Sequence, residues 1–320
     1  MRAAVVDKLG EAPRCGSFAE PDLQAGETLV HVSAAALKQL ERAIVAGKHY
    51  SSPKVLPIVP GLDGVGTRDD GTRVYFMAQR RPFGAMAERA PASFTVAVPD
   101  GLDDVTAAAV VNPALAAWLP LTTRGRLARG ETVMVLGATG AAGRMAVTMA
   151  RHLGAGRVVA CGRRAEVLAA LGADATIELG QPEDQLTAAF AAEAERGVGV
   201  IVDYIWGRPA ELLIGALTRG DVHSADPGAD IRYVSVGAMA GADIRMPSAA
   251  LRGSRLELIG SGTGNFPDDA GMRDAITQVF ALARAGALPI ETRHYPLESV
   301  ETAWRADNPA DVRPVMTMKE

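Results

Sequence analysis

The segment Val133 to Val147, "VMVLGATGAAGRMAV", joins an apolar run, a turn of small residues and an amphipathic run. Four of its first five residues are apolar, which is typical of a strand buried on both faces. After the turn, apolar residues recur at helical spacing as far as Leu153, and Gly154 can end the helix. The free N–H groups and the dipole of such a helix start favour an anion. On its own the pattern also fits an ordinary strand-to-helix turn. The predicted anion-binding residues are Ala138, Thr139, Gly140, Ala141, Ala142 and Gly143.

Downstream of Gly130, short apolar runs alternate with helical stretches, a pattern that indicates a parallel sheet. Six such strands are enough for a doubly wound α/β sheet that binds a dinucleotide. The predicted strands are Thr132–Leu136, Arg157–Cys161, Ala175–Leu179, Val200–Tyr204, Ile231–Val236 and Arg255–Gly260.

The first 120 or so residues have a different pattern. Short strands at 2–6, 28–34, 72–77, 85–90 and 93–98 are separated by Pro, Gly and Asp turns, which predicts a mainly β domain. Residues 103–121 predict a helix interrupted at Pro113. A helix closed by Gly286, a helix around Val300–Trp304 and a strand at 314–318 complete the chain, and the last two are expected to return to the β domain.

Composition restricts the class of protein. The 320 residues are enough for two domains, and 48% apolar and 22% charged residues are ordinary for a soluble chain. A net charge of −4 argues against a nucleic-acid partner or an anionic membrane surface. No apolar run approaching a membrane span is expected, and the N-terminal residues lack the apolar region of a signal peptide. Because Cys15 and Cys161 are the only cysteines, a disulfide framework is not expected and the cytoplasm is the expected location.

The position that usually distinguishes dinucleotides lies after the second of these strands. An acidic residue about 20 positions past the last glycine normally binds the ribose 2′-hydroxyl of NADH. Here that position is Gly162, 19 residues after Gly143, and Arg163 and Arg164 follow it. Guanidinium groups bind phosphate, so NADPH with its 2′-phosphate is the predicted cofactor. The alternative for the two arginines is a solvated start of the next helix.

Several motifs occur in a fixed order: "PGLDGVG" (60–66), "PDGL" (99–102), "RGETVMVLGATGAAG" (129–143), "LGAD" (171–174), "VSVGAMAG" (234–241) and "ESVETAW" (298–304). In these the chain resembles the medium-chain dehydrogenase/reductase superfamily, in its zinc-independent quinone oxidoreductase branch. The resemblance implies a β-rich, GroES-like catalytic domain made of 1–121 and 263–320. A dinucleotide-binding domain at 122–262 is expected between these two segments, and the protein is expected to be a homodimer.

The resemblance also implies that the chain binds no metal. Zinc-dependent relatives carry a ligand cysteine and a ligand histidine at positions that align with Lys38 and Leu62, and neither residue can take that part. The four-cysteine structural zinc lobe is missing as well. The histidines show no paired ligand spacing; they are His31, His49, His152, His223 and His294.

Without zinc, a proton donor has to be sought elsewhere. The candidates for a catalytic role are Lys38 and Tyr50, the second because the family often has a tyrosine there. The alternative for Lys38 is an ion pair with Asp63 or Glu41, and that for Tyr50 is an aromatic residue that only lines the pocket.

Further cofactor contacts are carried over from the family. Val236, Gly237 and Ala238 are expected beside the nicotinamide, and Asp203 is expected either to flank the ribose or to cap its turn. Trp206 is expected either to narrow the cofactor cleft or only to pack. The other predicted cofactor-binding residues are Asn112, Tyr204, Ser261, Gly262 and Asn265.

These observations together predict an NADPH-dependent reductase of quinones or α,β-unsaturated carbonyl compounds, with a small electrophile as substrate. Hydride addition to a conjugated acceptor spreads the charge onto an oxygen and therefore needs little help from a Lewis acid. A reductase of simple aldehydes and a non-catalytic NADPH-binding protein are the alternatives. The homodimer is expected to form through the strand edge at 255–262.

Overall fold

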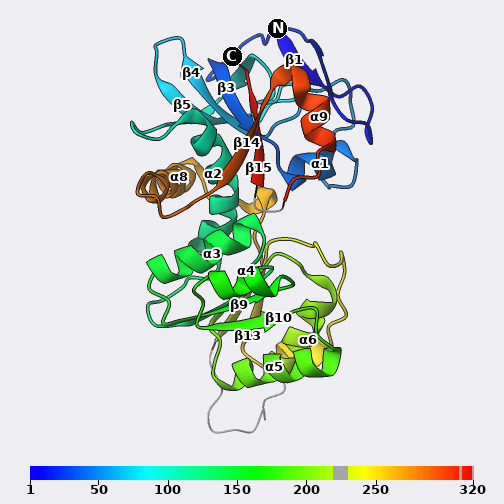
Figure 1. Cartoon of the computed structure of the whole chain (residues 1–320), viewed down its shortest axis with the longest axis vertical. Helices are drawn as coiled ribbons and strands as arrows, with labels where there is room; N and C mark the ends of the chain where they lie inside the picture. The colour runs from blue at the N-terminus through cyan, green and yellow to red at the C-terminus, as the bar shows by residue number, and fades with distance from the viewer. Residues whose placement is uncertain (219–229, 310–311, 319–320) are drawn as a thin grey trace. The chain divides into compact units, whose positions relative to one another are not determined.

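The computed structural model describes residues 1–218, 230–309 and 312–318 (Figure 1). It divides into two compact units, one of Met1–Asn112 with Ile276–Glu320 and one of Pro113–Ala275. The predicted domain boundaries, after residues 121 and 262, both fall inside the second unit. His223 lies outside the described residues.

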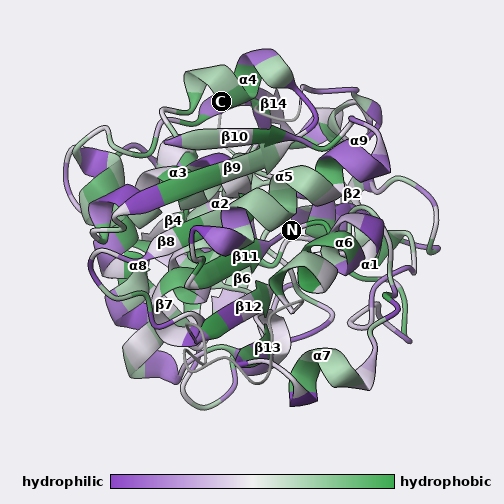
Figure 2. Ribbon diagram, turned by 90° about the horizontal axis from the view of Figure 1, so that it is seen from below, coloured by the Kyte–Doolittle hydropathy of each residue, from purple (hydrophilic) through white to green (hydrophobic). Residues whose placement is uncertain are grey.

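The second unit is built on a six-stranded parallel sheet in the order β10-β9-β8-β11-β12-β13, and Figure 2 shows the labelled strands in this succession. Strand order reverses between β8 and β11, which is the switch point where doubly wound sheets bind ligands. All six predicted strands are confirmed to within one residue at each end. Their bounds are β8 (Thr132–Leu136), β9 (Arg157–Gly162), β10 (Ala175–Glu178), β11 (Val200–Asp203), β12 (Ile231–Ser235) and β13 (Leu256–Gly260).

Helices cover both faces of this sheet. In Figure 1, α3 and α4 lie on one side of it and α5 and α6 on the other. Met134, Ile201 and Phe190 are fully buried between the layers, which explains why the strands read as continuous apolar runs. The helices of this unit are α3 (Ala141–His152), α4 (Ala165–Ala170), α5 (Glu183–Glu195), α6 (Gly207–Leu217), α7 (Ser248–Arg252) and the 3-10 helix η2 (Thr263–Asn265).

The first unit has a two-stranded sheet, β1-β2, and a seven-stranded sheet in the order β14-β15-β3-β4-β5-β7, with β6 also paired to β3. The closing strand β15 pairs antiparallel with β3, so the C-terminal segment returns to the β-rich unit as predicted. The strands are β1 (Arg2–Val5), β2 (Arg14–Ser17), β3 (Thr28–Ala36), β4 (Asp63–Arg68), β5 (Arg73–Met77), β6 (Arg89–Ala92), β7 (Phe94–Ala97), β14 (Glu291–Pro296) and β15 (Val312–Thr317).

The strand expected at 85–90 is wrong in its first four residues, since β6 begins only at Arg89. The backbone N–H groups of Ala85 and Met86 donate to Gly61 and Pro60, whereas the carbonyl of Met86 accepts from Ala4. The hydrogen bonds of 85–86 are thus divided between residues 60–61 and Ala4, so this segment does not pair with one neighbouring strand.

The helix that was predicted to be interrupted at Pro113 is continuous and belongs in part to each unit. Helix α2 (Asp104–Leu119) runs through this proline and is followed by a π-helical turn, Pro120–Arg124. The flanking Val111 and Ala114 are fully buried, so packing outweighs the missing N–H. The remaining helices of the first unit are α1 (Gln39–Val45), α8 (Asp269–Arg284, which extends into this unit from the second), the 3-10 helix η3 (Leu297–Ser299) and α9 (Val300–Arg305).

By length and composition, Asp104–Arg124 is also a stretch able to cross a membrane, with a mean hydropathy of 1.4 over its most apolar window. It is longer and more apolar than the sequence pattern indicated. Because 67% of that window is buried inside the protein, core packing accounts for its composition.

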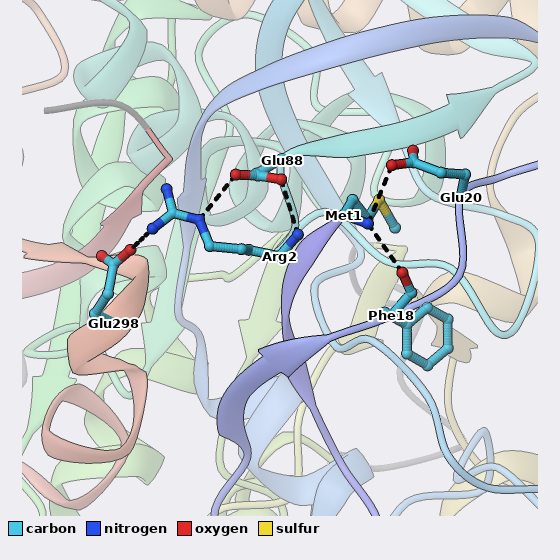
Figure 3. Close-up of polar contacts among 6 residues, drawn as sticks. All are labelled: Met1, Arg2, Phe18, Glu20, Glu88 and Glu298. Atoms are coloured by element: carbon cyan, nitrogen blue, oxygen red, sulfur yellow. Dashed lines mark hydrogen bonds and ion pairs between the residues drawn. The ribbon is translucent and has the colours of Figure 1, made fainter.

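Segments from both ends of the chain meet at the first strand (Figure 3). The Met1 amine donates to the Phe18 carbonyl at 3.0 Å and pairs with the Glu20 carboxylate at 3.0 Å. Glu88 accepts from the Arg2 backbone N–H at 2.8 Å and from its Nε at 2.9 Å, and Glu298 of η3 pairs with the same guanidinium. These contacts join β1 to the turn before β6 and to the C-terminal segment.

Candidate functional site

The glycine loop lies at the carboxyl end of β8, at the switch point of the sheet. The N–H groups of Gly137 and Ala138 each donate to the Cys161 carbonyl at 2.9 Å, which joins the loop to the end of β9. A Cβ on Gly143 would lie 2.2 Å from the Gly137 carbonyl oxygen, so only glycine permits this approach of helix and strand. A Cβ on Gly140 would meet only that oxygen, at 3.5 Å, so the space above Gly140 is open.

Helix α3 starts directly from this loop. Its N-cap is Gly140, and no side chain caps the helix. The N–H groups of the first turn, on Ala141, Ala142 and Gly143, have no acceptor within an α-helix and carry the positive end of its dipole. The predicted residues therefore form a backbone cradle suited to a pyrophosphate.

Gly162, the last residue of β9, packs against this loop. A Cβ at this position would lie 2.5 Å from Thr139 Cγ2 and 3.2 Å from Leu168 Cδ2. A side chain at this position, including the carboxylate that would bind the ribose of NADH, would therefore have to displace the Thr139 side chain.

Two guanidinium groups converge on the same loop carbonyl. Arg164 donates to the Thr139 oxygen, and Arg144 Nε donates to it at 3.4 Å. Arg163 is exposed beside them. Sequence reasoning missed Arg144, although its place directly after Gly143, in the first turn of α3, was a signal that could have identified it.

Asp203, at the end of β11, is fully buried and caps its own turn. Its Oδ1 accepts from the N–H groups of Ile205 at 2.7 Å and Trp206 at 3.0 Å, and its Oδ2 accepts from the Tyr233 hydroxyl at 2.7 Å. Burial raises the pKa of this carboxyl despite these three donors. The Trp206 ring packs edge-on against Tyr233 at 6.2 Å. Asp203 therefore caps its own turn and Trp206 packs on Tyr233, and a cofactor contact by either residue stays a prediction.

The segment after β12 lies at the same edge of the sheet. The N–H groups of Val236 and Gly237 donate to the Asp203 carbonyl at 2.7 and 3.2 Å, and Ala238 follows them, exposed. The Tyr204 hydroxyl donates to the Ala116 carbonyl at 2.8 Å, and burial raises its pKa. The strand ends thus bring Tyr204 and 236–238 to the edge that carries the glycine loop.

The residues after β13 are held by local contacts. The Ser261 N–H donates to the Ser235 carbonyl at 2.8 Å. The Asn265 amide accepts from the Gly262 N–H at 2.9 Å and donates to the Gly260 carbonyl at 3.1 Å. Asn112 lies in the middle of α2 and is partly exposed. Cofactor contacts by these residues stay predictions.

The first unit contains a buried ion cluster around Lys38, at the start of α1. Its Nζ donates to Asp63 Oδ1 at 2.7 Å and to Glu41 Oε1 at 2.9 Å. All three side chains are at most 6% exposed. Glu41 Oε2 also accepts the Lys38 backbone N–H at 3.0 Å. The ion pairs offered as the alternative for Lys38 are therefore both present.

Charge balance holds this cluster together. Burial alone would lower the pKa of Lys38, but attraction to Asp63 and Glu41 outweighs it and raises that pKa. Burial raises the pKa of Asp63 even with Lys38 beside it. Arg313 is a second nearby cation and donates to the Leu37 carbonyl at 3.4 Å.

Tyr50 lies in the loop after α1, with 76% of its surface exposed. Its ring stacks on His49 with centroids 4.0 Å apart. The two residues named as candidate proton donors thus differ sharply, because Lys38 is enclosed by carboxylates whereas Tyr50 faces solvent. Among the described residues, no group of three or more His, Cys, Asp or Glu side chains is arranged to hold a metal ion.

We compared the sequence of the chain with those of known proteins. No protein-family model matches the chain. A probable NADPH-dependent quinone reductase of Emericella nidulans, tdiC, is 31% identical over 228 residues, which are 67% of this chain and 62% of that relative. The chain thus spans less than two thirds of that relative's length.

Two solved structures share the fold. The quinone oxidoreductase of Thermus thermophilus, also solved with NADPH, is 26% identical with a TM-score of 0.77, over 99% of this chain and 100% of that one. A mycobacterial quinone oxidoreductase is 21% identical with a TM-score of 0.84, over 99% of each chain, and supports the fold alone. With its ordered motifs, its sheet order and these similarities, the chain belongs to the medium-chain dehydrogenase/reductase superfamily.

Proposed function

We propose that this protein is a zinc-independent, NADPH-dependent oxidoreductase that reduces quinones or α,β-unsaturated carbonyl compounds. The observation that carries the proposal is the glycine cradle at the switch point. At this cradle Gly162 stands in place of a carboxylate, and two guanidinium groups donate to the Thr139 carbonyl. The names of the Emericella and Thermus relatives support the same cofactor and substrate class.

The positive charge at the start of α3 and the open space above Gly140 both fit the pyrophosphate of NADPH. The N–H groups at the start of α3 would hold the pyrophosphate, and Arg164, Arg163 and Arg144 would hold the 2′-phosphate. When bound, NADPH supplies the hydride. Val236, Gly237 and Ala238 would orient the nicotinamide through their backbone, in keeping with their place at the carboxyl edge of the sheet.

Zinc independence is supported by what occupies the cluster. The Lys38 ammonium pairs with both Glu41 and Asp63, and Arg313 lies near them as a second cation, so these acids already have cationic partners in place of a metal ion. Elemental analysis of purified protein should find no stoichiometric zinc, and chelators should leave activity unchanged. One zinc bound per chain would contradict this part of the proposal.

Without a Lewis acid, a conjugated acceptor is the substrate that needs least assistance. Solvent or one donor suffices to protonate the oxygen that receives the charge, and the exposed phenol of Tyr50 is the donor we propose. We assign Lys38 a structural role, because both of its nearest acceptors are carboxylates in a buried cluster.

Steady-state oxidation of NADPH, followed at 340 nm, tests the reaction. The expected result is turnover with 1,4-naphthoquinone, and a much higher kcat/KM for trans-2-hexenal than for hexanal. Equal rates with the enal and the saturated aldehyde would favour a simple carbonyl reductase. Tight NADPH binding with no oxidation across a panel of electrophiles would favour a non-catalytic binding protein.

We also propose a homodimer in the cytoplasm. Strand β13 ends the six-stranded sheet, and Leu258 on it is 38% exposed, which leaves an apolar edge for a second copy. Light scattering at micromolar concentration should give twice the chain mass, and a monomer mass would count against this assembly.

A further inference from the structure

Two neighbouring segments of the first unit carry no acidic residue at all. They are residues 42–62, which include the loop after α1, and residues 78–87 before β6. Arg81 Nη2 donates to the Ser51 carbonyl at 2.8 Å, and the Val59 N–H donates to the Pro82 carbonyl at 2.9 Å. These hydrogen bonds place the two segments side by side.

The five lysines and arginines of these two segments differ in whether they form ion pairs or hydrogen bonds with the rest of the protein. Arg42 donates to carbonyls at the end of α9, and Arg80 pairs with Glu27 at 2.6 Å. Lys48, Lys54 and Arg81 are exposed, and within the part of the chain that the structure describes none of them forms an ion pair. Three uncompensated positive charges therefore gather on a protein whose net charge is −4.

Two apolar side chains accompany these cations. Tyr50 is 76% and Val55 is 78% exposed, the two largest exposed fractions among the large apolar side chains of this unit. A flat aromatic face beside fixed positive charge suits a ligand with an aromatic or conjugated plane and an anionic substituent. We call Lys48, Tyr50, Lys54, Val55 and Arg81 the basic surface.

We propose that the substrate of this reductase carries an anionic group, and that the basic surface binds it. The inference rests on the proposed function, in which Tyr50 is the proton donor to the substrate. The conjugated part of the substrate packs on Tyr50 and Val55, while Lys48, Lys54 and Arg81 attract a carboxylate, sulfonate or phosphate attached to it. The loop after α1 then determines specificity by charge.

Two quinones that differ by one sulfonate group test the proposal: 1,4-naphthoquinone and 1,4-naphthoquinone-2-sulfonate. The variant is Lys48→Gln/Lys54→Gln, and the readout is the kcat/KM for the sulfonate divided by that for the neutral quinone. Each exposed charge should contribute about 1.4-fold to fivefold, so the double variant should lower this ratio at least about twofold. Raising the salt from 50 to 300 mM should lower the wild-type ratio as well.

A matched control separates local binding from a general effect of net charge. Lys8→Gln removes one positive charge, as each of the single variants Lys48→Gln and Lys54→Gln does, from a turn adjacent to the end of α1, where Gly10 N–H donates to the Val45 carbonyl at 2.9 Å. Lys8 already pairs with Glu11 at 2.9 Å. Its substitution should leave the ratio unchanged, and an equal fall in both proteins would overturn the proposal.

Calorimetric binding of the sulfonated quinone gives a readout that does not depend on turnover. Weaker binding by the double variant, with wild-type affinity in Lys8→Gln, supports the basic surface even if neither quinone is reduced; that lack of turnover would contradict the proposed function alone. Turnover of both quinones with an unchanged ratio and unchanged affinity would overturn the inference and leave the proposed function standing.

Discussion

Replacing Lys38 with methionine should destabilise the first unit more than any surface substitution. The change nearly keeps the length of the side chain but removes the ammonium that contacts both Glu41 and Asp63, at 2.9 and 2.7 Å. Breaking a buried ion pair by removing one partner costs about 3–5 kcal/mol, because the other charge is left uncompensated. With an m-value of about 3 kcal/mol per molar urea, the unfolding midpoint should fall by about 1 M or more.

The pH dependence has a definite sign. In the variant, the folded-state pKa of Asp63, which burial already raises, loses the opposing effect of Lys38 and rises further above its unfolded value. Groups with raised folded pKa values favour the folded state below their unfolded pKa and lose that contribution as pH rises through the folded pKa. The deficit relative to wild type should therefore be complete at pH 8 and shrink toward pH 5.

Two comparisons make this prediction refutable by urea denaturation. Lys8→Met breaks an ion pair whose side chains are 74% and 62% exposed and should cost less than about 1 kcal/mol. The triple variant Lys38→Met/Glu41→Gln/Asp63→Asn removes the charges together and should recover much of the loss. A Lys38→Met midpoint no lower than that of Lys8→Met would refute the reasoning.

Two further predictions concern the second unit. Gly143→Ala puts a Cβ 2.2 Å from the Gly137 oxygen, so this variant should lower the melting temperature of the apo protein. Gly140→Ala has its nearest contact at 3.5 Å, so this variant should keep a melting temperature near that of the wild type and weaken only NADPH binding. Equal melting temperatures would contradict this. Cys161 is fully buried and burial raises its thiol pKa, so at pH 8 iodoacetamide should label it only after unfolding; labelling in the folded state, detected by peptide mass, would contradict its burial.

The parallel sheet could be predicted closely because its strands are covered on both faces. Continuous apolar runs such as Thr132–Leu136 then read directly as strands. Strand β4 was not predicted, because its "DGVGTR" sequence has the composition of a turn. A Cβ on Gly66 would lie 2.2 Å from the His31 carbonyl, so contact with β3 requires glycine inside a strand. The strands β2 and β14 were missed as well.

The candidate site also has parts that could be predicted from the sequence and parts that could not. The backbone cradle follows from residue spacing, so its elements could be placed from sequence. Arg144 was missed because its contact with the Thr139 carbonyl depends on the direction of a side chain across the loop. The ion pairs of Lys38 were anticipated, since Glu41 is one helical turn away, but choosing them over a catalytic role required the burial that only the fold shows.

The central claim is that the second unit binds NADPH through its 2′-phosphate. Calorimetry at fixed ionic strength should show NADPH bound at least tenfold more tightly than NADH, since one charge-assisted contact of about 1.5 kcal/mol already gives that factor. The variant Arg163→Ala/Arg164→Ala should lose at least tenfold in NADPH affinity and keep its NADH affinity. Equal binding of both cofactors by the wild type, or an equal loss of both by the variant, would contradict the account.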